Sequence, residues 1–115
     1  FVQNIREFRQ WMAERGYGGA PLVISEYGIL MPEDYGFPLE RVAAFLHGTF
    51  DSMRAMTGVE GYAPDENRLV QWWFWYSLYD MWVYPTGNLW DAEAARLTGL
   101  GEAWSGYITR HEIAP

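Results

Sequence analysis

Residues 21–28 read Pro-Leu-Val-Ile-Ser-Glu-Tyr-Gly, an apolar run that ends in one carboxylate and is followed by a glycine. A short run of branched aliphatic residues predicts a strand buried on both faces, as in a parallel sheet between helices. The side chain of Glu26 alternates in phase with Leu22 and Ile24. Because the residues that end the strands of a parallel barrel ring the active site, Glu26 is the first candidate for a catalytic group.

Residues 71–77 read Gln-Trp-Trp-Phe-Trp-Tyr-Ser and predict a second strand, because aromatic side chains favour strands. Neighbouring side chains of a strand point to opposite faces, so these aromatic residues form two sets. If Trp73 and Trp75 face the same way as Gln71, each offers a flat apolar platform on which the C–H face of a sugar ring can lie. The other set then packs under the helices as core: Trp72, Phe74 and Tyr76.

Apolar residues at helical spacing predict a first helix over residues 1–15. Phe1, Ile5, Phe8 and Met12 form its buried face, and Arg9 falls among the polar residues elsewhere on the helix.

Two further helices follow. The second runs from about Pro38 to a stop at Gly58, and its apolar stripe is predicted to be buried: Val42, Phe45, Leu46, Phe50 and Met53. The third begins after Thr98, a favoured N-cap residue. The order helix-strand-helix-strand-helix indicates an α/β fold with two parallel strands, and nothing divides residues 1–115 into separate domains.

The composition limits the partners of the chain. A formal net charge of −7 with only 8 lysines and arginines argues against nucleic acid and against anionic membranes, which attract cations. There is no cysteine, and neither His47 nor His111 has a partner at ligand spacing, so we predict no metal and no cofactor. No apolar run approaches the roughly 20 residues that span a bilayer. A neutral, polyhydroxylated ligand fits these features better.

The predicted elements are too few for a closed parallel barrel. An eight-stranded barrel takes about 250 residues, so three helices and two strands correspond to about its last third. The chain opens at Phe1 already in helical rhythm, and its aromatic content of 18% is high for a small domain. We therefore expect a barrel fragment whose other strands lie upstream.

The chain resembles the C-terminal part of the clan A glycoside hydrolases, which are retaining enzymes with a (β/α)8 barrel. The resemblance rests on Ile-Ser-Glu-Tyr-Gly at 24–28, on the aromatic strand after the next helix, and on the closing stretches 84–91 and 97–101. Gly99 departs from it, because a proline often follows the threonine there. The resemblance implies that Glu26 is the catalytic nucleophile and that Trp75, or Trp73, lies beside the sugar where cleavage occurs.

The same resemblance implies that the acid/base glutamate lies upstream of this chain. A retaining mechanism needs two carboxyl groups, so we expect the fragment alone to be inactive towards its carbohydrate substrate. Tyr27 is a further substrate-binding candidate, although its phase favours helix packing. Asp80 either reaches a sugar hydroxyl or caps a turn. Trp82, Tyr84 and Trp90 either line a cleft or pack within their loop.

Other interpretations stay open at this point. Glu26 could instead cap the next turn or pair with an arginine. The whole protein could be a catalytically silent barrel that binds carbohydrate, or the chain could be a small α/β interaction module with no sugar site.

Overall fold

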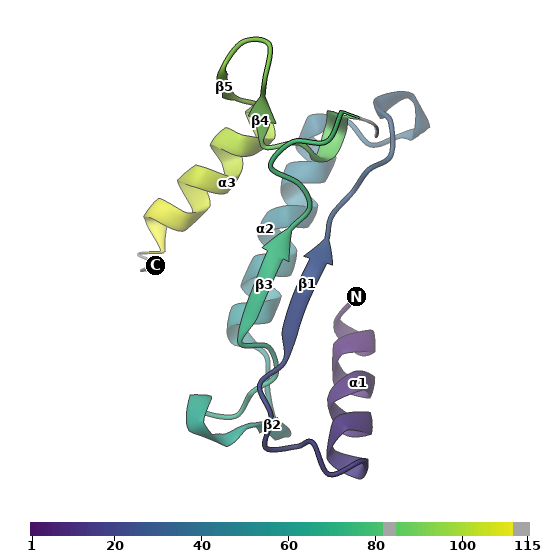
Figure 1. Cartoon of the computed structure of the whole chain (residues 1–115), viewed down its shortest axis with the longest axis vertical. Coiled ribbons are helices and arrows are strands. Elements are labelled where there is room, and N and C mark those ends of the chain that lie inside the picture. The colour runs from purple at the N-terminus through teal and green to yellow at the C-terminus, as the bar shows by residue number, and fades with distance from the viewer. Residues whose placement is uncertain (82–84, 112–115) are drawn as a thin grey trace. The chain divides into compact units, whose positions relative to one another are not determined.

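The computed structural model describes residues 1–81 and 85–111 and has a mixed α/β architecture. Its helices are α1 (Val2–Glu14), α2 (Leu39–Ala55) and α3 (Gly99–Arg110). The strands β1 (Val23–Tyr27) and β3 (Trp72–Trp75) pair in a two-stranded sheet, and both run in the same direction (Figure 1). The predicted order of three helices and two parallel strands is therefore confirmed.

Three short strands escaped prediction. β2 (Thr57–Tyr62) follows α2 and turns back through a short 3₁₀ helix at Ala63–Asp65. β4 (Trp90–Asp91) and β5 (Arg96–Leu97) form an antiparallel hairpin before α3. As predicted, Thr98 caps α3, and its side-chain oxygen accepts a hydrogen bond of 3.0 Å from the backbone N–H of Gly101.

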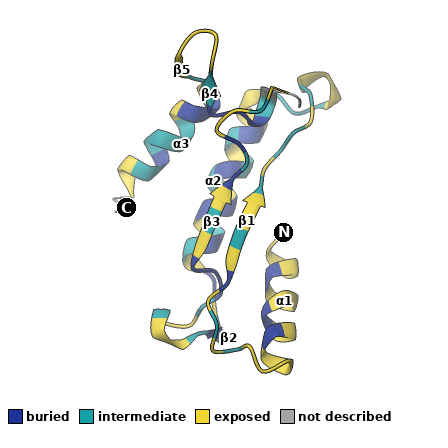
Figure 2. Cartoon of the chain, in the orientation of Figure 1, coloured by how far each residue is buried: buried dark blue, intermediate teal, exposed yellow. Residues whose placement is uncertain are grey.

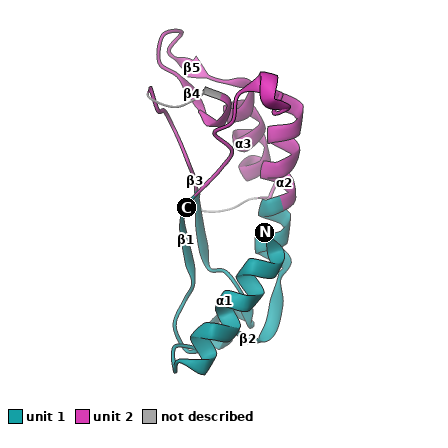
Figure 3. Ribbon diagram, turned by 90° about the vertical axis from the view of Figure 1, so that its right-hand side faces the viewer, with its two compact units in different colours: residues 1–26, 49–74 teal, residues 27–48, 75–115 magenta. Residues whose placement is uncertain are grey.

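The chain divides into two compact units (Figure 3). Unit 1 comprises residues 1–26 and 49–74, and unit 2 comprises residues 27–48 and 75–115. The division passes through β1, α2 and β3, so each of these elements contributes residues to both units.

The inward face of α1, in unit 1, differs from the predicted one. Ile5 and Met12 are buried as expected, but Phe8 is 47% exposed and Arg9 is 0% exposed. The ring of Phe8 stacks on that of Trp11 at a centroid distance of 5.3 Å, which gives both apolar rings a partner at the surface. Arg9 points inward because its guanidinium donates hydrogen bonds to backbone and side-chain oxygens there.

The buried stripe of α2 is confirmed at four of its five positions (Figure 2), namely Val42, Leu46, Phe50 and Met53, while Phe45 is half-buried. The helix ends at Ala55 rather than at Gly58, which instead lies in β2. The N–H of Gly58 donates to the carbonyl of Asn67, so pairing with the returning chain takes over where the helix stops.

The two faces of β3 are the reverse of the prediction. In unit 1, the ring of Trp73 packs edge-on against Phe50 of α2 at 5.8 Å, whereas Trp72 is 55% and Phe74 is 57% exposed. In unit 2, Trp75 is buried. Trp72 and Phe74 are therefore not core, and Trp73 and Trp75 are the residues that face the helix. Alternation alone could not decide this, because both sets are aromatic.

β1 is less buried than its apolar sequence suggested. Val23 is 44% exposed, Ser25 and Glu26 are also exposed, and the other two residues of the strand are half-buried. The prediction of a strand buried on both faces is therefore wrong for this chain. One face of the pair remains open.

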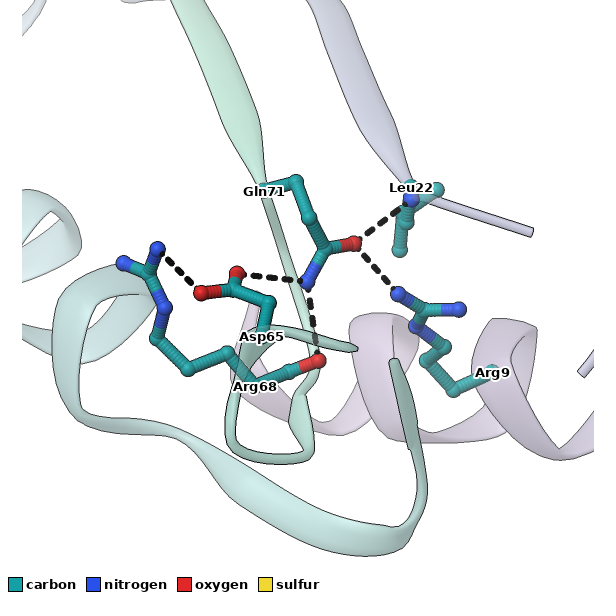
Figure 4. A network of polar contacts seen from close by, with 5 residues as sticks. All are labelled: Arg9, Leu22, Asp65, Arg68 and Gln71. Atoms are coloured by element: carbon teal, nitrogen blue, oxygen red, sulfur yellow. Dashed lines mark hydrogen bonds and ion pairs between the residues drawn. The ribbon is translucent and has the colours of Figure 1, made fainter. Parts of the chain in front are cut away.

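Arg9 fastens α1 to the beginnings of both strands of the sheet. Its Nε donates to the carbonyl of Leu69 at 2.6 Å, and one terminal nitrogen donates to the carbonyl of Ala20 at 2.8 Å. The other terminal nitrogen donates to Oε1 of Gln71 at 2.5 Å, and the same oxygen accepts from the N–H of Leu22 at 2.8 Å (Figure 4). Burial lowers the pKa of Arg9, and the negative charge of Glu60 opposes this.

The amide nitrogen of Gln71 extends the network to the turn before β3. It donates to Oδ2 of Asp65 at 3.1 Å and to the carbonyl of Arg68 at 3.0 Å (Figure 4). Oδ1 of Asp65 in turn pairs with the guanidinium of Arg68 at 2.7 Å. The hydrogen bond from Arg68, together with that from Gln71, holds the pKa of Asp65 below its usual value. Asp65 thus ties the turn before β3 to Gln71.

Arg9→Lys should lower the free energy of unfolding by about 2–3 kcal/mol, because one ammonium cannot reach all three oxygens and leaves buried acceptors unpaired. Chemical denaturation measures the loss. Arg6→Lys on the exposed side of the same helix is the matched control and should change stability little. Equal stability of the two variants would contradict the role given to Arg9.

Asp65→Asn should lower the free energy of unfolding by about 0.5–1 kcal/mol near neutral pH. The loss is small because the ion pair with Arg68 is partly solvated: the side chain of Arg68 is 35% exposed and that of Asp65 is 24% exposed. The folded-state pKa lies below the ordinary value of 3.8, so the carboxylate stabilises the fold above that pH. This contribution is lost as the pH falls through the lowered pKa. Unfolding free energies measured from pH 7 to pH 2 should therefore converge for wild type and variant in acid. A difference in unfolding free energy that persists in acid would refute the stabilising role of the Asp65 carboxylate.

Candidate functional site

Glu26 lies one residue before the C-terminal end of β1 in unit 1 and is exposed. Residues 22–26 line a hollow of about 440 Å³ together with Phe1, Asn4, Ile5 and Phe8 of the first helical segment. Within the described parts of the chain, the carboxylate of Glu26 has neither a hydrogen-bond partner nor an ion-pair partner. It neither caps the next turn nor pairs with an arginine, so its two oxygens are available for a ligand.

Backbone hydrogen bonds join the chain at both ends of β1 to the chain at both ends of β3. Leu22 accepts from the N–H of Gln71 at 3.0 Å, and Tyr27 accepts from the N–H of Tyr76 at 2.8 Å. The N–H of Trp72 also lies 3.5 Å from the carbonyl of Leu22.

Alternation then divides the side chains of unit 1 between two faces. Trp73 packs against α2, so its neighbours in β3 point the other way. Trp72 and Phe74 therefore lie on the face of β3 away from α2 and are exposed, and Glu26 is exposed on the paired strand β1. An exposed carboxylate and exposed aromatic rings thus occur on paired strands.

In unit 2, Tyr27 and Trp75 come together in an aromatic cluster with Phe45 of α2. Their ring centroids lie 5.4 Å apart in an edge-on contact, and Phe45 lies 6.5 Å from Tyr27 and 6.3 Å from Trp75. The indole N–H of Trp75 donates to the carbonyl of Gly87 at 2.8 Å. With 9% of its surface exposed, Trp75 presents no broad ring face to a ligand. Tyr27 has the helix-packing role that its phase favoured.

Gly28 allows the chain to leave β1 close to the residue that follows β3. A Cβ atom at this position would overlap the carbonyl oxygen of Tyr76 and would lie 3.6 Å from the ring of Trp75. Steric crowding in unit 2 thus explains why the Glu-Tyr-Gly motif has a glycine at this position. No other residue fits between these two strand ends unless the backbone moves.

Asp80 lies in the loop after β3, in unit 2. Its carboxylate accepts a short hydrogen bond from the hydroxyl of Tyr76. The side chain of Asn88 makes two hydrogen bonds to the backbone of Asp80. Oδ1 of Asn88 accepts from the N–H of Asp80 at 3.0 Å, and Nδ2 of Asn88 donates to the carbonyl of Asp80 at 3.1 Å. Oδ1 also accepts from the hydroxyl of Ser77 at 3.2 Å.

Asn88 is the residue that the sequence interpretation missed. It is 5% exposed and orders the loop, yet Pro-Thr-Gly-Asn is an ordinary turn signal that gives no hint of a buried amide. Trp82 and Tyr84, the other aromatic candidates of this loop, lie outside the described residues.

The described residues hold no group of three or more His, Cys, Asp or Glu side chains that could bind a metal ion. A ring nitrogen of His47 lies 3.2 Å from the carbonyl of Ala103, and the ring stacks on Tyr107 at 5.5 Å. These contacts give His47 a packing role between α2 and α3. None of the helices in the described ranges has the length and apolar character needed to cross a membrane.

Comparisons with protein-family models, with curated proteins and with solved structures found no match to this chain.

Gly28→Ala should destabilise the protein by about 1–3 kcal/mol, because the added methyl group meets the backbone oxygen of Tyr76. Gly48→Ala is the matched control. Gly48 lies in α2 with nothing within 4 Å of an added Cβ, so alanine there should stabilise the helix by up to ~1 kcal/mol. Thermal unfolding of both variants measures the difference, and a Gly28→Ala protein as stable as wild type would contradict the close approach.

Proposed function

We propose that this chain is the C-terminal part of the (β/α)8 barrel of a retaining glycoside hydrolase, with Glu26 as the catalytic nucleophile. The observation that carries the proposal is the state of Glu26: an exposed carboxylate without a partner among the described residues, near the C-terminal end of a parallel strand. Carboxylates used only for structure are commonly capped or paired. The catalytic groups of parallel barrels come from this end of the strands.

The open face of unit 1 suits a sugar. Phe74, on the strand paired with that of Glu26, is 57% exposed, so its ring offers an apolar surface to a ligand. We therefore assign the aromatic contact of the substrate to this face, with Phe74 and Trp72 in place of Trp73 and Trp75. The acidic chain favours a neutral substrate, and the resemblance to clan A points to a β-linked oligosaccharide, polysaccharide or glycoside.

The reaction is a double displacement. Ionised Glu26 attacks the anomeric carbon and forms a glycosyl ester, while a second carboxyl group protonates the departing glycosidic oxygen. The same second group then removes a proton from water, which attacks the anomeric carbon and releases Glu26. Retaining enzymes hold the two carboxyl groups about 5–5.5 Å apart. The second group belongs to the upstream part of the polypeptide in this proposal.

Glu26→Gln in the full-length protein should lower kcat at least ~10³-fold on an aryl β-glycoside while the protein still binds substrate, because the amide cannot form the ester. Glu40→Gln, at an exposed position in the first turn of α2, is the matched control and should keep full activity. Unchanged turnover of Glu26→Gln would refute the assignment.

Chemical rescue identifies the role of the residue more sharply. In Glu26→Ala, added azide should enter the space of the carboxylate and restore turnover, and the glycosyl azide formed should have the inverted anomeric configuration. Rescue with retained configuration would show that another residue is the nucleophile. A wild-type protein that binds oligosaccharides but never cleaves them would instead favour a carbohydrate-binding barrel.

A further inference from the structure

A second hollow lies in unit 2, beside the β4–β5 hairpin. It has a volume of about 310 Å³, and the residues that line it include Tyr79, Asn88, Trp90, Asp91, Glu93 and Thr98. Every one of them belongs to unit 2, so the hollow is a feature of that unit alone. None of them has a part in the chemistry proposed for Glu26.

Hydrogen bonds order the hairpin side of the hollow. The N–H of Trp90 donates to the carbonyl of Leu78 at 2.8 Å, and Trp90 pairs with Leu97 across the hairpin. Oδ1 of Asp91 accepts from the N–H groups of Glu93 and Ala94, which fixes the turn that follows. The backbone of Trp90 and the turn after it are therefore held by hydrogen bonds.

Several polar groups at the hollow remain unused. Within residues 1–81 and 85–111, the indole N–H of Trp90, the hydroxyl of Tyr79 and the carboxylate of Glu93 have no hydrogen-bond partner. The described lining thus combines two aromatic rings, two donors and an acceptor. This is the chemistry that recognises a ring with apolar faces and hydroxyl groups around its edge.

The charge of the hollow narrows the class of ligand. Asp91 and Glu93 contribute carboxylates, and the described residues that line it include no lysine or arginine. An anionic ligand would be repelled, whereas a neutral sugar would meet acceptors for its hydroxyl groups. A volume of about 310 Å³ lies at the small end of the range for ligand pockets, so it suits one or two sugar rings of a longer chain.

We propose that this hollow is an accessory binding site for a neutral oligosaccharide, with Trp90 and Tyr79 as its aromatic walls and Glu93 as an acceptor for sugar hydroxyl groups. The identity of the ligand as a sugar rests on the proposed function, while the site itself is separate from Glu26. It would hold a distant part of the chain whose cleavage takes place elsewhere in the protein.

The test is a titration followed by NMR of the indole N–H signals, in the full-length protein carrying Glu26→Gln so that no ligand is cleaved. The probes are cellohexaose, xylohexaose and mannohexaose. The signal of Trp90, identified by its loss in Trp90→Ala, should shift saturably with at least one of them. Trp90→Ala should weaken binding of that probe about tenfold, equal to ~1.4 kcal/mol, and Trp90→Phe should recover part of the affinity.

Trp11→Ala is the matched control, because Trp11 is 46% exposed on α1 and lies outside the hollow. If Trp90→Ala does not fold, Tyr79→Ala tests the same wall. Oligogalacturonate, which is anionic, should bind at least tenfold more weakly than the neutral probe. An unmoved Trp90 signal with all three neutral probes, or equal affinity for the anionic one, would overturn the proposal. Activity retained in Glu26→Gln would refute the nucleophile alone, since the Trp90 signal reports binding and not turnover.

Discussion

The buried guanidinium of Arg9 is the constraint on which unit 1 depends. It binds three oxygens from two segments that lie far apart in sequence: Ala20 before β1, and Leu69 and Gln71 before β3. A buried cation is costly unless its donors are used, so both segments have to be in place together with α1. Once they are, the residues that lead into the two strands are fixed.

Much of the fold was predictable, and the reason is periodicity. The stripe of α2 follows helical spacing so closely that Val42, Leu46 and Phe50 could be assigned to the core, and Thr98 is a typical cap. The faces of β3 could not be assigned, because an unbroken aromatic run gives both faces the same hydrophobic signal. β2 was missed for the opposite reason: its glycines at 58 and 61 weaken the strand pattern. Arg9 was placed outside because a charged residue is rarely buried without a network.

The candidate site, like the fold, could be predicted from the sequence only in part. The position of Glu26 at the end of an apolar run could be predicted, since strand ends are where parallel sheets present their functional groups. Its lack of a partner could not, because pairing depends on side chains brought close only by the fold. The two ends of the strands also have different roles in unit 1: the polar network secures the first residues, and the exposed carboxylate stands near the other end. The residues that stabilise the start of the sheet are therefore different from the residue proposed for catalysis.

The contrast between Trp75 and Trp72 has a consequence for spectroscopy. An indole enclosed by aromatic rings and bonded to a carbonyl is shielded from water, whereas one that is 55% exposed is in contact with it. Their fluorescence should therefore differ in colour, with bluer emission from Trp75 and redder emission from Trp72. A small water-soluble quencher reaches the second and not the first. One strand of four residues thus carries its own internal reporters for both of its faces.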